Sequence, residues 1–478
     1  MTLPRGPLLL ALALLLLAAG LMAQDSPTLN TTDDGYRGIW YFNQKSNDPY
    51  VYKYSGGLGT YCAKHKPFAV YSAAAGKTFF CYGGTSKRSN RELHHMVSWY
   101  DHEKRQVPRP TILLDKKTSD AHDNPVISLD DAGHVWIFST SHGRARPSYI
   151  HRSRRPYSID AFERVSATYV GDDGKRSPLT NFSYFQAWHV KGRGFACFFT
   201  RYADPAKRTN MFMTSADGVR WSRWQRLATI EDGHYQVSGQ RGEKAGVMFN
   251  YHPAGKGLNW RTNLYYIETS DLGATWRTAA GRAVDVPITT VASPALIRDY
   301  RSEGLLVYLK DLAFDEQGYP VLLYVTSKGY RSGPANDPRT WTIAHWTGKR
   351  WAIHTITTSD NNYDMGSLYL GAESWRIIAP TQIGPQPYNP GGEVAEWISG
   401  DRGATWKRAR QLTERSPRNH TYVRRPVNAQ PGFRALWADG HGREPSASDL
   451  YFADDAGRVY RLPRVMTGDR ATPALLTR

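Results

Sequence analysis

Three turns in the sequence repeat one arrangement of Ser, Asp, Gly and Trp. Residues 399–406 (SGDRGATW) carry it in full, residues 270–276 (SDLGATW) are one residue shorter, and residues 215–221 (SADGVRW) are a degenerate copy. In such a turn the Asp and Ser side chains cap backbone amides, the Gly takes a positive φ, and the Trp packs beneath the hairpin. The repeat therefore favours a chain of many similar antiparallel hairpins.

The rest of the chain agrees with this pattern. From about residue 35 onward no convincing amphipathic helix is evident, and runs of four to eight β-forming residues alternate with turn clusters such as 131–133 (DAG) and 455–457 (DAG). Aromatic residues make up 13 % of the chain, with 29 Tyr and 15 Trp, which suits strands. We expect roughly 26 strands.

The length of 478 residues would normally indicate two or three domains, yet no linker or change of composition divides the chain. Radial repetition explains this, because seven blades would use about 65 residues each. We therefore predict an all-β fold, a single β-propeller catalytic domain over residues 24–478 with seven four-stranded blades. Six or eight blades are the alternatives, and segments 34–42 and 450–463 would close the ring.

Residues 1–23 do not fit the strand pattern. Arg5 precedes an apolar run, and small residues follow up to Ala23, which is typical of a cleaved signal peptide. An uncleaved anchor is the alternative. No later stretch approaches the ~18–20 apolar residues of a membrane span. We therefore expect a secreted or periplasmic protein, cut near Ala23, soluble and monomeric.

Only three cysteines are present, which excludes a disulfide scaffold. Cys62 and Cys81 could meet across neighbouring strands, and Cys197 would then remain alone. Scattered buried thiols are the simpler expectation.

The charge limits the possible partners. Lys and Arg number 61 against 43 Asp and Glu, a formal charge of +18. An export signal argues against nucleic acid, and no basic amphipathic helix supports binding to a membrane. The partner we expect is an anionic polysaccharide, which such a field would concentrate.

Four residues form the strongest chemical pattern. His122 stands just before an expected strand and His142 just after one, 20 residues later, which is about one hairpin out and back. Tyr184 and Arg201 bracket a second hairpin in the same way. All four can thus face one end of the central channel, although each could also be an ordinary strand-end residue.

Such a set suits β-elimination on a uronic acid. The C5 proton of a uronate is weakly acidic, and an Arg can neutralise the carboxylate so that a carbanion can form. A His or a Tyr removes the proton, and a Tyr or a His protonates the leaving oxygen. Histidine has a near-neutral pKa, whereas a tyrosine base needs a nearby cation, and the sequence leaves the assignment open.

These features resemble a known family. The repeated turn is the Asp-box, and together with the opening residues 34–40 (DGYRGIW) and the spacing of His122, His142, Tyr184 and Arg201 it resembles the BNR-repeat polysaccharide lyases, which include ulvan lyases. The resemblance implies a seven-bladed, sialidase-like propeller that cleaves rhamnose–uronate linkages without a required cofactor. Here Tyr184 and Arg201 are 17 residues apart, one more than the family spacing.

Other polar residues are candidates for binding. Arg261, His252 and His441 could contact the substrate, although a solvated strand-end role is as plausible for Arg261. Asp360 and Asp364 lie in an oxygen-rich loop that could hold a structural Ca²⁺, with turn capping as the default interpretation. No Cys/His spacing suggests zinc.

Three other functions compete with the lyase. A sialidase would need an early Arg-Ile-Pro segment, and residues 36–40 (YRGIW) lack the Pro. A propeller glycoside hydrolase could release terminal rhamnose from the opposite face, with His65 as its catalytic residue. A non-catalytic glycan-binding propeller is the third alternative.

Overall fold

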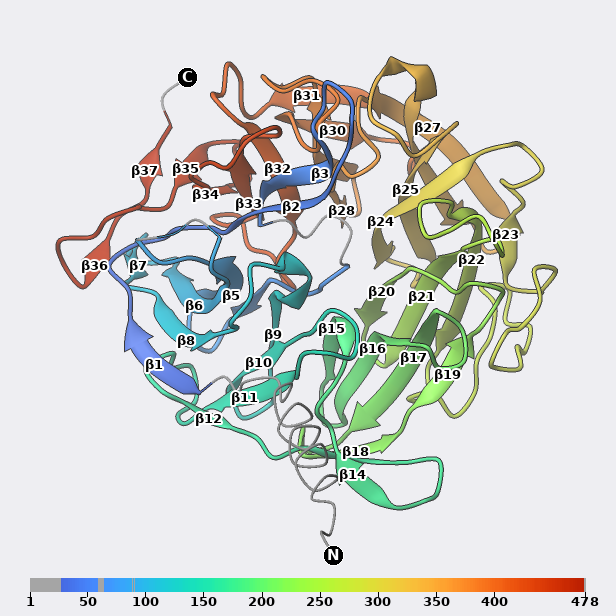
Figure 1. Ribbon diagram of the computed structural model, residues 1–478, viewed down its shortest axis with the longest axis horizontal. Helices are drawn as coiled ribbons and strands as arrows, with labels where there is room; N and C mark the ends of the chain where they lie inside the picture. Colours follow the sequence, from blue (N-terminus) through green and yellow to red (C-terminus); the bar gives the residue numbers. More distant parts are fainter. Residues whose placement is uncertain (1–26, 59–63, 88, 90, 477–478) are drawn as a thin grey trace, which may run out of the picture.

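Mostly antiparallel strands arranged around a central channel make up the structure, a computed structural model (Figure 1). It describes residues 27–58, 64–87, 89 and 91–476. Over these residues, 37 strands form ten sheets, seven of which have four or five strands. The all-β propeller is therefore confirmed.

The seven larger sheets follow the chain around the ring. The first two contain β1 (Thr28–Thr32), β8 (Thr111–Asp115), β6 (His94–Asp101), β5 (Lys77–Gly84) and β4 (Ala69–Ser72), then β12 (Phe162–Arg164), β11 (Tyr149–Ser153), β10 (Val135–Ser139) and β9 (Pro125–Leu129). The next two contain β15 (Ser183–Val190), β16 (Gly194–Tyr202), β17 (Arg208–Ser215) and β19 (Gln225–Ala228), then β20 (Gln236–Arg241), β21 (Lys244–Tyr251), β22 (Thr262–Thr269) and β23 (Leu296–Arg298).

The last three of these sheets complete the ring. They contain β24 (Leu306–Phe314), β25 (Pro320–Ser327), β26 (Arg339–Trp346) and β27 (Trp351–Ser359); β28 (Ser367–Leu370), β29 (Trp375–Gln382), β30 (Glu393–Ser399) and β31 (Lys407–Gln411); and β32 (Asn419–Arg424), β33 (Ala435–Gly440), β34 (Leu450–Ala453), β35 (Val459–Arg461) and β37 (Ala474–Leu475).

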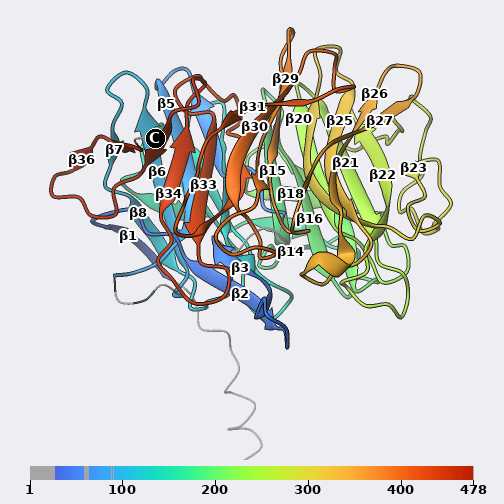
Figure 2. The same ribbon diagram turned by 90° about the horizontal axis from the view of Figure 1, so that it is seen from above.

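Smaller sheets depart from the predicted seven uniform blades. They pair β2 (Trp40–Lys45) with β3 (Tyr52–Gly57), β13 (Thr168–Val170) with β14 (Arg176–Pro178) and β18 (Arg220–Arg223), and β7 (Val107–Pro108) with β36 (Arg470–Ala471). The β2–β3 hairpin packs against β32 and β33 as an eighth unit and projects from one face of the ring (Figure 2). The predicted blade count and uniformity are therefore corrected: the chain near its start adds a hairpin of its own. Two short 3₁₀ turns, η2 (Ala121–Asp123) and η3 (Pro334–Asn336), interrupt the connections.

The Asp-box turns have the expected geometry. The Ser399 hydroxyl accepts the Gly403 N–H at 2.8 Å, Asp401 accepts both the N–H and the hydroxyl of Thr405, and Gly403 has φ +87°. The second turn corrects the sequence interpretation. Thr269 takes the position of the first Ser, bonding both Asp271 and the Gly273 N–H, so this copy has full length.

The two ends of the chain meet across the ring closure. The Tyr36 N–H donates to the Pro463 carbonyl, the Gly38 N–H to the Ser448 carbonyl, and the Met466 N–H to the Asp34 carbonyl, at 2.6 to 3.0 Å. These bonds confirm that the opening and closing segments join. β1 pairs with β8 at the outer edge of the first sheet. β36, near the other end of the chain, pairs with β7, which lies between β6 and β8 in the sequence.

Buried basic residues connect the inner strands across the channel. Lys66 forms an ion pair with Asp311, Lys310 donates to the Asn362 carbonyl at 2.6 Å, and Arg424 donates to the Lys310 carbonyl at 3.1 Å. Each of these groups is less than one-tenth exposed. The axis of the channel is therefore filled with side chains, and its two mouths are separate.

Some sequence predictions fall outside the described residues. The leader at 1–23 and Cys62 are among them, so the predicted cleavage and the Cys62–Cys81 alternative remain predictions. Cys81 and Cys197 are free thiols buried in different hydrophobic clusters. In the described part of the chain, no helix has the length and apolar character needed to cross a membrane.

Candidate active site

The two predicted histidines stack on one another at one mouth of the channel. His122 lies in η2, just before β9, and His142 follows β10. The antiparallel β9–β10 hairpin brings the residues before its first strand and after its second to the same end. The ring centroids are 4.0 Å apart, with an interplanar angle of 14°. The prediction that this hairpin unites them is confirmed.

Asp120 joins the pair. Its Oδ1 is 2.6 Å from His122 Nδ1, and its Oδ2 is 2.8 Å from His142 Nδ1. Arg146 donates to Asp120 at 2.7 Å and forms two bonds of 2.8 Å with the buried Asp123. Burial opposes ionisation of Asp120, but the charge of His122 and the hydrogen bonds from both imidazoles outweigh it and hold the pKa of Asp120 well below its usual range. The carboxylate thus fixes which nitrogen each ring turns inward.

His142 is the more accessible of the two rings. Its side chain is 28 % exposed, whereas that of His122 is 3 % exposed and has its Nε2 2.9 Å from the Tyr54 hydroxyl. Burial and then the neighbouring His122 lower the pKa of His142, and the Asp120 carboxylate partly opposes them. At neutral pH His142 is therefore uncharged. With its Nδ1 proton on Asp120, its Nε2 lone pair can act as a base.

Tyr184 faces the histidines from a distorted strand. A register shift in the β15–β16 pairing lies between Ser183 and Gln186, and Tyr184 has φ +51°. Bulges next to functional sites re-aim side chains in this way. The Tyr184 hydroxyl accepts a 3.0 Å hydrogen bond from Tyr202, and its ring centroid is 6.1 Å from that of His122 and 6.5 Å from that of His142.

The structure brings Arg208, not Arg201, to this cluster. Arg201 bonds Asp204 at 3.1 Å and stacks over Trp224 at 4.0 Å. Successive residues of a strand point to opposite faces, so Tyr202, which faces the cluster, leaves Arg201 facing away. Arg208 is paired with Tyr202 across the β16–β17 ladder and therefore shares its face. The predicted role of Arg201 does not match this geometry.

Arg208 is a buried cation held among tyrosines. It is 6 % exposed and lies 5.0 and 5.1 Å from the ring centroids of Tyr202 and Tyr235. Its Nε and Nη1 have no hydrogen-bond partner within the described part of the chain. Its charge contributes to the lowered pKa of His142. A buried guanidinium with unsatisfied donors is suited to receive a carboxylate.

Two predicted binding residues adjoin this cluster. Arg261 lies 4.4 Å from the Tyr235 ring centroid, and the His252 ring packs edge-on against the same tyrosine at 5.2 Å. Burial, then the charges of Arg261 and Arg208, push the pKa of His252 well below its usual range. Arg208, Arg261 and His252 thus surround Tyr235 on one side of the site.

The other predicted residues lie apart from the histidine pair. His441 contacts the β2–β3 hairpin through the bond from the Trp40 indole to its carbonyl. Asp360 and Asp364 accept the backbone N–H groups of Tyr388 and Gly391, which is the default turn-capping role. Burial raises the pKa of Asp360 to about 6. A Ca²⁺ ion at these carboxylates remains a prediction.

His65 does not lie on the opposite face of the ring. Its side chain is fully buried, its Nε2 is 2.9 Å from the Thr140 hydroxyl, and its ring centroid is 6.0 Å from that of Tyr184. Burial lowers its pKa to about 3. His65 thus packs behind Tyr184 in the interior. A hydrolase would need an exposed catalytic histidine, and His65 is not exposed.

Sequence reasoning missed several members of this site. Asp120 stands two residues before His122 and could have been found as an orienting carboxylate. Arg208, Tyr202 and Tyr235 depend on cross-strand pairing and carry no local signal. Asp120, His122 and His142 also form a group whose ligand atoms lie within 4.8 Å of one another. A metal ion bound through the Nδ1 atoms would have to displace their bonds to Asp120.

The fold and this cluster define the class of the protein. The profile described as "BNR repeat-containing family member" matches residues 74–359, more than half of the chain. The chain therefore belongs to the BNR repeat-containing family of β-propellers.

Within that family, two relatives are named for one activity. An ulvan lyase of Nonlabens ulvanivorans is 22 % identical over 384 residues, which cover 72 % of this chain and 76 % of the relative. A second, "Ulvan Lyase-PL25" of Pseudoalteromonas sp. (strain PLSV), is 23 % identical over 268 residues, covering 49 % of this chain and 52 % of the relative.

Solved structures show the same fold. A PL25 ulvan lyase bound to -[GlcA(1-4)Rha3S]- superposes with a TM-score of 0.67 at 16 % identity, covering 90 % of this chain and 96 % of the other. The polysaccharide lyase Uly1 gives a TM-score of 0.62 at 10 % identity, covering 91 % and 99 %.

Proposed function

We propose that this protein is a polysaccharide lyase that cleaves the linkage between rhamnose and a uronate by β-elimination. The observation that carries the proposal is the buried Arg208, with unsatisfied donors, beside the Asp120-linked histidines and the Tyr184–Tyr202 pair. This set supplies a neutral base, a proton donor and a carboxylate partner in one cluster. The named activity of both relatives supports the same reaction class.

The proposed mechanism moves two protons and one electron pair. Arg208 binds the uronate carboxylate and stabilises the charge that grows on it as the C5–H bond breaks. His142 Nε2 takes the C5 proton, the electron pair forms the C4–C5 double bond, and the C4–O bond breaks. The Tyr184 hydroxyl gives its proton to the departing oxygen, and Tyr202 supports Tyr184 through their hydrogen bond.

Two features of the site favour these assignments. Its lowered pKa keeps His142 in the basic form at neutral pH. Tyr202 donates a hydrogen bond to the Tyr184 oxygen, which stabilises that oxygen when Tyr184 gives up its proton. Arg208 takes the role expected of Arg201, which is to neutralise the uronate carboxylate. Arg261 places a second cation beside the same tyrosine, Tyr235.

One experiment tests the reaction class. The protein is incubated with ulvan or with rhamnose–glucuronate side chains, and the ultraviolet absorbance of a 4,5-unsaturated uronate is followed. A rise in absorbance that His142→Ala abolishes supports the lyase. Release of free rhamnose without a rise in absorbance would contradict the lyase and support the hydrolase. Binding of the polysaccharide without either product would support a non-catalytic glycan-binding propeller.

We further propose that the protein acts outside the cytoplasm as a monomer. Residues 1–23 carry the pattern of a cleaved leader, and the charge of +18 suits capture of an anionic polymer. Mass spectrometry of the exported chain would locate the cut expected near Ala23. Elution on gel filtration would test the monomer.

A further inference from the structure

The mouth opposite the histidines opens into a charged groove. The inner strands β9 and β15 begin at the histidine–tyrosine cluster, whereas the groove is lined by residues where β20, β24 and β28 end, such as Arg241, Phe314 and Leu370. Inner strands of a propeller run in the same direction, so the two sets lie at opposite mouths.

Three hollows join to form this groove. The central one, of about 320 Å³, shares Leu370, Arg425 and Asn428 with a larger one of about 1010 Å³. It also shares Trp188 and Asn428 with a third, of about 270 Å³, on its other side. Asn428 belongs to all three. The groove is therefore continuous and extends beyond the room that one sugar needs.

Three arginines of the groove form no ion pair within the described residues: Arg424 and Arg425 line the central hollow, and Arg434 lines the larger one. The carboxylate in the central hollow, Asp311, pairs with Lys66, so positive charge remains in excess there. The Nε atoms of Arg424 and Arg425, and Nη2 of Arg424, are buried without a hydrogen-bond partner. Arg424 is only 3 % exposed, yet it lines the central hollow. Buried guanidinium donors left unsatisfied are costly, and an anion would satisfy them.

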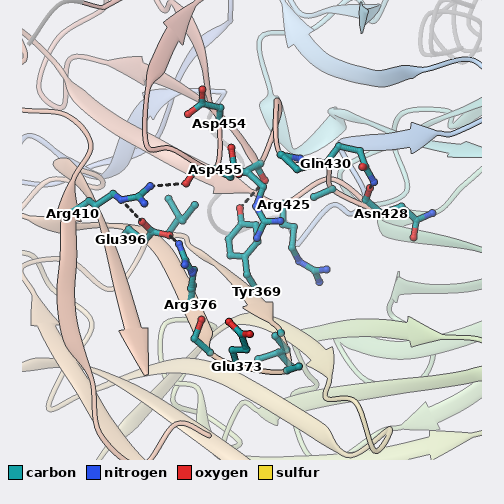
Figure 3. A pocket seen from close by; sticks show the side chains of 18 residues that line it. Tyr369, Glu373, Arg376, Glu396, Arg410, Arg425, Asn428, Gln430, Asp454 and Asp455 are labelled. Atoms are coloured by element: carbon teal, nitrogen blue, oxygen red, sulfur yellow. Dashed lines mark hydrogen bonds and ion pairs between the residues drawn. The ribbon is translucent and has the colours of Figure 1, made fainter. Parts of the chain in front are cut away.

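Tyr369 supports two of these arginines. Its ring centroid lies 5.0 Å from the Arg434 guanidinium and 5.9 Å from that of Arg425, and its hydroxyl donates to the Arg434 carbonyl at 2.9 Å. Figure 3 shows Arg425 and Tyr369 together at the centre of the larger hollow. Stacking on an aromatic ring holds a guanidinium in place while leaving its donors free.

The rim of the groove differs from its centre. Arg376 and Arg410 both pair with Glu396, at 2.9 and 3.5 Å, as the dashed lines in Figure 3 show. Glu373, Asp454 and Asp455 also line the larger hollow, with Asp454 bonded to Arg458. The larger hollow thus carries carboxylates beside its arginines, and the excess of positive charge is greatest in the central hollow, around Arg424 and Arg425.

We propose that this groove is a second, non-catalytic binding site for a chain of anionic polysaccharide. Arg424, Arg425 and Arg434 bind its carboxylate or sulfate groups, while the histidine site at the other mouth cleaves a different stretch of polymer. The filled channel axis keeps the two sites independent. The choice of ligand rests on the proposed function, because the polymer is taken to be the substrate itself.

The test measures binding separately from cleavage. In a His142→Ala background, which does not degrade the polymer, the Kd for ulvan is measured with and without Arg425→Ala/Arg434→Ala. We expect weakening of about tenfold or more from the loss of two charge-assisted contacts. Arg425→Lys/Arg434→Lys should recover part of the affinity. Desulfated and carboxyl-reduced ulvan show which group is bound, and neutral dextran should not bind.

A matched control removes the same charge elsewhere. Arg282→Ala/Arg350→Ala changes two exposed arginines that lie outside the groove lining. It should alter the Kd less than twofold, and an equal effect of both double variants would overturn the proposal. In the active protein, Arg425→Ala/Arg434→Ala should leave kcat on a short oligosaccharide unchanged.

The outcomes separate the groove from the lyase. Loss of ulvan binding in the groove variant of a protein that forms no unsaturated uronate would retain the groove and reject the lyase. Formation of the unsaturated product with unchanged Kd in the groove variant would do the reverse.

Discussion

Replacing Asp120 by Asn tests whether one carboxylate orients both histidines. Asp120 accepts from His122 at 2.6 Å, from His142 at 2.8 Å and from Arg146 at 2.7 Å. An amide has one oxygen that accepts and one NH₂ group that only donates. At least one imidazole must therefore lose its acceptor, and with it the orientation that points its Nε2 toward the substrate.

The magnitude follows from these contacts. A positioned general base contributes about 10²- to 10⁴-fold to the rate, so kcat/KM of Asp120→Asn should fall within that range. The fold should survive, because losing one such bond costs about 1–3 kcal/mol and Arg146 still holds Asp123 through two bonds of 2.8 Å. The carboxylate raises the pKa of His142 against the effect of burial. Its removal should therefore move the acid limb of the kcat/KM profile to lower pH.

The assay is the rise of unsaturated uronate from ulvan, recorded between about pH 5 and pH 9. Asp160→Asn is the matched control, since Asp160 is exposed, bonds Arg155 and Ser158, and should leave the profile unchanged. A folded Asp120→Asn variant whose kcat/KM stays within about twofold of the original would refute the reasoning. So would a large loss of rate with an unshifted acid limb, because the carboxylate would then not be acting on His142.

Three further tests concern the arginine that binds the carboxylate, the proton donor and the second Asp-box. Arg208→Ala should lower kcat/KM by about 10²-fold or more, whereas Arg201→Ala should keep most of it; equal losses would return the carboxylate to Arg201. Tyr184→Phe should reduce kcat by about 10²- to 10⁴-fold with KM little changed, measured on the same substrate, and a change confined to KM would contradict the role of proton donor. In the second Asp-box, Thr269→Ala should lower the free energy of unfolding in urea by about 1–2 kcal/mol and Ser270→Ala should not, since Thr269 holds the Gly273 N–H; the opposite order would restore the shorter motif.

Local patterns carried the fold and the histidine pair. The Asp-box residues act within one turn, so spacing alone could identify them, and one hairpin was enough to bring His122 and His142 together. The arginine could not be found in this way. Arg201 and Arg208 both lie near one strand end, and only the alternation of Tyr202 and its cross-strand partner decides which guanidinium faces the cluster.

The additional hairpin and the buried position of His65 also could not be predicted from the sequence. Blade counting from an average length assumes equal repeats, whereas the β2–β3 hairpin consumes chain without adding a full blade. The position of His65 depends on its own contacts with Thr140, which follows β10, and with Tyr422 of β32. Such long-range packing leaves no periodicity for a sequence to show.

The joined ends of the chain have a consequence for how the ring can form during synthesis. Bonds such as Gly38 to Ser448 and Met466 to Asp34 link residues more than 400 positions apart. No arrangement of the earlier blades can supply these partners, so a nascent chain must hold an open arc with an exposed edge until its last sheet emerges from the ribosome. A C-terminal truncation before Ser448, which removes the partners of Gly38 and Asp34, should therefore leave the ring open and increase aggregation.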